Sequence, residues 1–164
     1  MDILSHALWG ATVIRTRPLL YWAFLTGAAP DILGSGPGFL YLLSVRHRMW
    51  SVGTWPLLLP WMQDNYHLWH SLVGSAFFFI FLLFFSQRFW ILILPYLLHI
   101  FMDVLTHRGN GWQRMLFPFK FTAVSTISGI NWWESWWVWP LNLGLLVAGN
   151  GIIEYRKFKK KMSL

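Results

Sequence analysis

Three stretches of this chain are each long and apolar enough to cross a lipid bilayer as a helix. They cover residues 68–86, 89–106 and 132–153, and a spanning helix needs about 20 mostly apolar residues. Only 12% of the 164 residues are charged, whereas soluble domains carry about a quarter. A soluble fold of this size could not hide so much apolar surface. The sequence therefore predicts an all-α integral membrane protein with a single domain over residues 1–164.

Shorter apolar segments make up the N-terminal part of the chain. Residues 3–14 and 19–33 predict two helices joined by a basic turn. The Gly- and Pro-rich stretch 34–38 predicts a break after them. Residues 39–45 and 52–62 are apolar but short, which is typical of interfacial or re-entrant pieces. The total expected is four or five membrane helices.

Basic residues set the expected orientation of these helices. The net charge is +7, and five Lys and Arg residues lie between positions 156 and 161. Because Lys and Arg mark cytoplasmic loops, residues 155–164 predict a cytoplasmic tail at anionic headgroups. The expected partners are thus membrane lipids rather than nucleic acid. The expected location is a membrane, with the C-terminus on the cytoplasmic side.

Five ionisable residues interrupt the apolar segments: His6, Asp31, His70, His99 and Asp103. At 1.5 Å per residue they lie about 13 to 24 Å from the cytoplasmic ends of their helices. Four helices therefore bring them to a common band in the outer half of the membrane. An ionisable group at the bilayer centre costs roughly 2.5–3.5 kcal/mol, so each one is a hypothesis about function.

The types and spacing of these residues indicate a metal site. His99 and Asp103 are four residues apart and share a helix face, and His67 and His70 are three apart. Converging imidazoles and carboxylates are ligands for a divalent metal, and zinc is expected, as one or two ions, with manganese as the alternative. Glu134, within a Trp-rich run, is either a further ligand or general base or a carboxylate at headgroup level.

Three other interpretations of the same residues stay open. The His and Asp side chains could form a structural network between helices. His70 and His99 could be axial ligands of a haem. The band could also be part of a path for a metal ion or proton.

Several short motifs resemble those of one family. They are residues 2–10 (DILSHALWG), 27–31 (GAAPD), 70–71 (HS), 99–106 (HIFMDVLT) and 116–119 (LFPF). In this order they resemble the membrane-bound metal-dependent hydrolases, also described as LexA-regulated inner-membrane hydrolases. The resemblance covers roughly residues 1–120 and implies His6, Asp31, His70, His99 and Asp103 as the site.

The third motif departs from the family pattern. The family has His-Arg-Gly ahead of Thr-His-Ser, whereas this chain has NYHLWHS at 65–71, with His67 at a different spacing. The family's ordered His and Asp set is similar to that of zinc-dependent phospholipase C. The resemblance implies a membrane-embedded hydrolase of a phosphoester or lipid substrate in a bacterial-type inner or plasma membrane. With the His and Asp band, it predicts attack by metal-activated water, and either Asp31 or Glu134 is the carboxylate expected to orient that water.

Overall fold

The computed structural model describes residues 2–44, 59–106, 115–119 and 135–163. The elements, in chain order, are α1 (Ile3–Val13), α2 (Arg17–Ser44), α3 (Pro60–Trp69), α4 (Leu72–Phe85), the 3-10 helix η1 (Gln87–Leu92), α5 (Ile93–Thr106) and α7 (Val138–Met162). Helices and turns account for the regular structure of these residues, which contain no strand. The all-α prediction is confirmed for this part of the chain.

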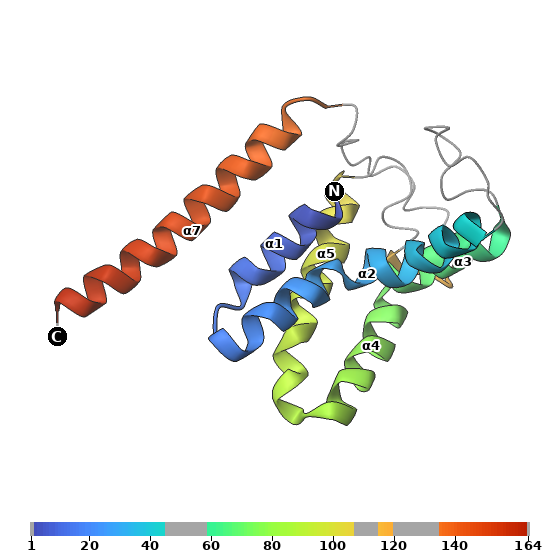
Figure 1. Ribbon diagram of the computed structural model, residues 1–164, viewed down its shortest axis with the longest axis horizontal. Coiled ribbons are helices and arrows are strands. Elements are labelled where there is room, and N and C mark those ends of the chain that lie inside the picture. Colours follow the sequence, from blue (N-terminus) through green and yellow to red (C-terminus); the bar gives the residue numbers. More distant parts are fainter. Residues whose placement is uncertain (1, 45–58, 107–114, 120–134, 164) are drawn as a thin grey trace.

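Two antiparallel pairs form the body of the molecule. Figure 1 shows α1 beside the first half of α2, and α4 descending to η1 before α5 returns beside it. Helix α3 packs along the second half of α2, and α7 lies outside α1. Where the pairs meet, Ala29, Tyr96 and Ile100 form a buried apolar cluster. This cluster lies on the same helices as the His and Asp residues.

The predicted break at residues 34–38 is wrong, because α2 continues through this stretch with Pro37 inside it. The reason is the packing of α3. A Cβ atom on Gly34 would lie 3.2 Å from the ring of His70 and 3.3 Å from Cα of Tyr66. Gly34 therefore allows α3 to approach α2 closely instead of ending the helix.

The prediction of one continuous helix over 68–86 is also wrong. The chain bends by 65° between α3 and α4. The hydroxyl of Ser71 accepts a hydrogen bond from the amide of Gly74 and donates one to the carbonyl of Leu68. Ser71 is thus the N-cap of α4 at the bend. A prediction based on apolar length alone does not detect such a cap.

The other boundaries differ by smaller amounts. The predicted helix 89–106 corresponds to η1 followed by α5. The predicted helix 132–153 begins later, at Val138, and continues to Met162, so most of the basic tail 155–164 is helical.

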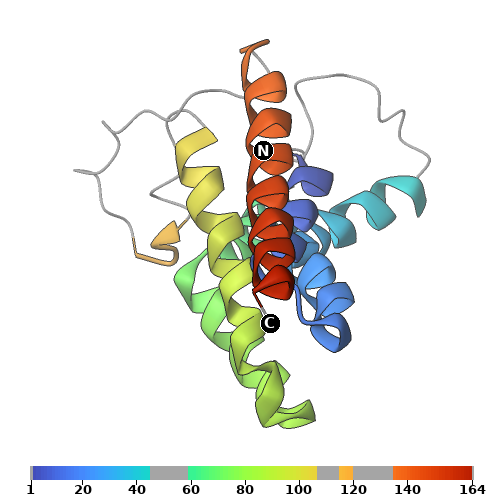
Figure 2. The same cartoon turned by 90° about the vertical axis from the view of Figure 1, so that its left-hand side faces the viewer.

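One helix among the described residues, Gln87–Thr106, is long and apolar enough to cross a membrane, with a mean hydropathy of 1.8. The bent pair α3 and α4 would add a second span if it crosses as one unit. The turn after α1, the segment around η1 and the C-terminal part of α7 lie toward the same end of the molecule (Figure 2).

Gly74 at the bend is the position where an added methyl group has least space. Its Cβ would lie 2.1 Å from the carbonyl oxygen of Leu68 and 3.0 Å from Cα of Trp69. Because both neighbours are backbone, we expect Gly74→Ala to lower the free energy of unfolding by about 1–3 kcal/mol. The measurement is thermal unfolding in detergent, followed by Trp fluorescence.

The matched control is Gly144→Ala on α7, where an added Cβ meets nothing within 4 Å. This variant should unfold at the wild-type temperature or slightly above it, because Ala favours the helix. Equal melting temperatures for Gly74→Ala and the wild type would contradict the close contact between Gly74 and the backbone of Leu68.

Candidate metal centre

Four ionisable side chains from three parts of the fold meet at one point. Asp31 comes from the middle of α2, His70 from the bend between α3 and α4, and His99 and Asp103 from successive turns of α5. One ligand atom of each lies within 4.8 Å of those of all the others. This group could hold a metal ion, and the convergence of these four residues is confirmed.

The distances around this group match the spacing of neighbouring ligands on a small cation. His70 Nε2 lies 3.2 Å from Asp31 Oδ1 and 3.6 Å from Asp103 Oδ2. His99 Nε2 lies 3.4 Å from Asp103 Oδ2 and 3.8 Å from Asp31 Oδ1. Ligands held about 2.0–2.2 Å from zinc in tetrahedral geometry are separated from one another by about 3.3–3.6 Å.

Hydrogen bonds on the far side of each imidazole fix which nitrogen faces the group. Nδ1 of His70 donates to the carbonyl of Tyr66 at 2.8 Å, and Nδ1 of His99 donates to the carbonyl of Gly27 at 2.7 Å. A carbonyl can only accept, so both protons of the neutral rings are on Nδ1. The lone pair of each Nε2 therefore points into the group, as in metal-bound histidines.

As a result, four acceptors face one another at this point. Two imidazole lone pairs and two carboxylate oxygens cannot form hydrogen bonds with each other unless a proton or a cation lies between them. Nε2 of His99 is fully buried, and among the described residues it has no hydrogen-bond partner. The chemistry and spacing of these donors thus fit a divalent metal ion.

His6 lies beside the group rather than in it. Its Nε2 donates to Asp103 Oδ1 at 2.9 Å, and its ring stacks on that of His99 with centroids 3.6 Å apart. Asp103 thereby uses one oxygen for His6 and turns the other, Oδ2, toward His70 and His99. This geometry makes His6 a residue that orients a ligand carboxylate.

The position of His70 depends on contacts that surround the bend. Its ring stacks on Tyr66, with centroids 3.9 Å apart, and covers Gly34 of α2. The hydroxyl of Tyr96 on α5 donates to the carbonyl of Trp69 at 2.6 Å. Helices α2, α3 and α5 together therefore hold this imidazole in place, and its side chain is 2% exposed.

The remaining predicted site residues are not brought to this point. The ring of His67, on α3, lies 6.0 Å from that of Phe117 between centroids, and His67 is outside the group of four. Glu134 falls outside the described residues. The roles of His67 and Glu134 as ligand and general base stay predictions.

Several residues that shape the site were missed by the sequence interpretation. The carbonyls of Gly27 and Tyr66 fix the two ring tautomers, but backbone acceptors carry no sequence signal. The sequence interpretation treats Gly34 as part of a helix break and Gly74 as one residue of a continuous helix, whereas both lie at close contacts. Isolated glycines in helical patterns can indicate close packing, and this signal was present.

Comparisons of the chain with models of protein families, with curated proteins and with solved structures gave no match. The family resemblance of the motifs therefore stays a prediction. A conclusion about the function of this chain therefore depends on the geometry of the site and on the motifs of the sequence.

Loss of either carboxylate should abolish metal binding. We expect purified wild type to hold about one equivalent of a transition metal per chain, because the four ligand atoms converge on a single point. Asp31→Ala and Asp103→Ala should each lose it. The measurement is elemental mass spectrometry after identical purification, with helicity followed by circular dichroism.

Asp64→Ala is the control, since Asp64 is an exposed carboxylate on α3 outside the group. It should retain the metal. A folded wild type that stays metal-free after addition of zinc or manganese would contradict the metal centre.

His6 should affect metal affinity without being a ligand. His6→Ala should weaken metal binding about 10- to 100-fold, because Asp103 loses the donor that orients it. His6→Gln, whose amide can donate to the same oxygen, should recover part of the affinity. Competition with a chelator of known affinity measures both values. Complete loss of the metal in both variants would instead make His6 a ligand.

Proposed function

We propose that this chain is a membrane-embedded, metal-dependent hydrolase that acts on a phosphoester in a lipid. The observation that supports the metal dependence is the meeting of two imidazole lone pairs and two carboxylate oxygens in a buried position. The hydrolytic reaction rests on the resemblance of the motifs around His6, Asp31 and His99 to those of the membrane-bound hydrolases.

Exposed apolar side chains support the membrane location. Phe84 is 86% exposed and Phe85 66%, and both lie on α4 within a long run of Phe and Leu. On α7, Leu143 and Val147 are 62% and 65% exposed. Apolar surface of this extent is typical of contact with lipid, and the helix Gln87–Thr106 has the length to cross a bilayer.

The distribution of basic residues supports a topology. Arg15, Arg88 and the basic residues of α7 belong to the segments that lie toward one end of the molecule. By the positive-inside rule this end faces the cytoplasm. His6 lies near the opposite end of α1 and Asp103 near the end of α5, which supports a metal centre in the outer half of the membrane.

The residues of the site would have different roles in such a reaction. A dication supplies a nucleophile at neutral pH by lowering the pKa of bound water to about 7. His70, His99 and Asp103 are almost completely buried and would hold the ion, while His6 orients Asp103. The Asp31 side chain is 18% exposed, more than any other of the four. Water and substrate would therefore enter beside Asp31, and its carboxylate would orient the water.

The alternative functions have less support from the geometry. The rings of His70 and His99 are 5.1 Å apart between centroids, and both carboxylates contact the same nitrogens. A flat haem has no space between them. A carrier would need ligand groups along a path, whereas the described residues contain one such group of three or more.

The test is hydrolysis by metal-loaded protein of phospholipids with different headgroups in mixed micelles. Asp31→Asn should reduce the rate about 100-fold or more, since it removes a carboxylate acting on the attacking water. Removal of the metal with a chelator should abolish the activity, and restored metal should recover it. Asp64→Asn is the control and should keep the wild-type rate.

Metal occupancy is measured on the same samples, so that loss of the ion and loss of the carboxylate are separated. A hydrolytic activity that persists without metal would contradict the proposed mechanism. A metal-loaded protein that hydrolyses none of the phosphoesters would contradict the proposed reaction.

A further inference from the structure

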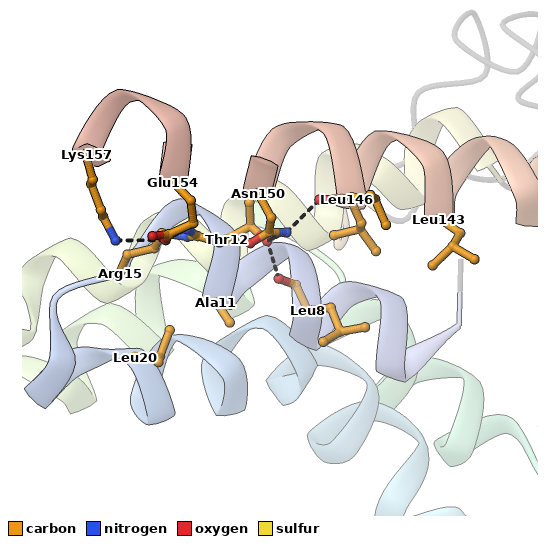
Figure 3. A pocket seen from close by; sticks show the side chains of 11 residues that line it. Leu8, Ala11, Thr12, Arg15, Leu20, Leu143, Leu146, Asn150, Glu154 and Lys157 are labelled. Atoms are coloured by element: carbon orange, nitrogen blue, oxygen red, sulfur yellow. Dashed lines mark hydrogen bonds and ion pairs between the residues drawn. The ribbon is translucent and has the colours of Figure 1, made fainter. Parts of the chain in front are cut away.

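A second candidate ligand site lies between α1 and α7, and Leu20 of α2 also contributes to its lining. A groove of about 680 Å³ runs between these helices (Figure 3). Leu8, Leu143 and Leu146 line one part of it, and Arg15, Glu154 and Lys157 lie at the other end. The groove thus has an apolar half and a charged half.

The charged end has more positive than negative groups. Nη1 of Arg15 and Nζ of Lys157 both contact the same oxygen of Glu154, Oε1, at 2.7 and 3.0 Å. One carboxylate is shared by two cations, which leaves a net positive charge at this end. The hydrogen bond from Lys157 holds the pKa of Glu154 below its usual value, so Glu154 stays ionised.

Polar contacts fix the walls of the groove. Nδ2 of Asn150 donates to the hydroxyl of Thr12 at 3.3 Å and to the carbonyl of Leu146 at 2.6 Å. At the charged end of the groove, Arg15 in the turn after α1 donates a hydrogen bond to Glu154 of α7. The groove is therefore a defined feature of the contact between α1 and α7.

We propose that this groove binds a phospholipid with an anionic headgroup. The phosphodiester would lie between Arg15 and Lys157, and an acyl chain would follow the leucines of the apolar half. The volume lies within the range of about 300–1,000 Å³ that is common for ligand sites. Phosphate is a group that Arg and Lys bind strongly.

The location of the groove favours a lipid over a soluble phosphate ligand. Its charged end is continuous with the basic run 156–161 at the end of the molecule that carries the positive charge. Anionic headgroups attract such residues by about 1 kcal/mol per charge. The site is separate from the metal centre, because Arg15 lies about two and a half helical turns beyond His6.

The experiment is native mass spectrometry of the full chain with phosphatidylglycerol or phosphatidylcholine of the same acyl length. We expect phosphatidylglycerol to bind more tightly. Arg15→Gln and Lys157→Gln should each weaken its binding about fivefold. Glu154→Gln should strengthen it by about the same factor, which a merely structural role would not produce.

Lys159→Gln is the matched control, since it removes the same charge from the opposite face of α7. It should leave the affinity unchanged. Ala11→Phe, which fills the apolar half of the groove, should weaken binding while keeping both cations. Inorganic phosphate should not displace the lipid.

Three results would overturn the proposal. They are equal affinity for the two lipids, an equal effect of Lys159→Gln and Lys157→Gln, and displacement of the lipid by inorganic phosphate. Unfolded variants are recognised by circular dichroism, and the gain expected for Glu154→Gln does not depend on a loss of folding.

Discussion

The structure depends on the burial of two carboxylates and two imidazoles that meet at one point. Asp31, His70, His99 and Asp103 direct acceptor atoms at one point, and the far nitrogen of each imidazole already donates to a backbone carbonyl. Two carboxylates in an apolar surrounding cost about 5–7 kcal/mol. Metal binding at structural sites contributes about 10 kcal/mol or more. A bound cation can therefore offset the burial. Without one, a proton has to lie between each imidazole and a carboxylate, as in the hydrogen bond between His70 and Asp31.

Close approach of the helices makes this arrangement possible. Gly34 lets the ring of His70 lie on α2, and Gly74 lets the start of α4 fold against the end of α3. The hydroxyl of Tyr96 then connects α5 to the same bend. The contacts of Gly34 and Tyr96 each join the bend that carries His70 to a helix that carries another member of the group, so the same residues set packing and ligand geometry.

The sequence allowed the group to be predicted, although not the backbone that supports it. Depth along each apolar segment depends only on residue counts and the helical rise, and the convergence of Asp31, His99 and Asp103 that it predicts is confirmed. Helix ends were less predictable. Residues 34–38 have the composition of a break, yet tertiary packing keeps them helical. The position of His6 beside Asp103 could not be derived either, since it depends on the side-chain direction of one histidine among several in the band.

Helix α1 connects the two sites of the molecule. It has 11 residues, about 16 Å, and is too short to cross a bilayer by itself. One side carries His6 and Gly10 against α2 and α5, and another carries Thr12 against α7. Contacts to α7 are polar, from Ser5 and Trp9 to Asn142 and from Thr12 to Asn150. These hydrogen bonds hold α7 against α1. The same short helix therefore positions the carboxylate of the metal centre and fixes the groove in which a lipid would lie.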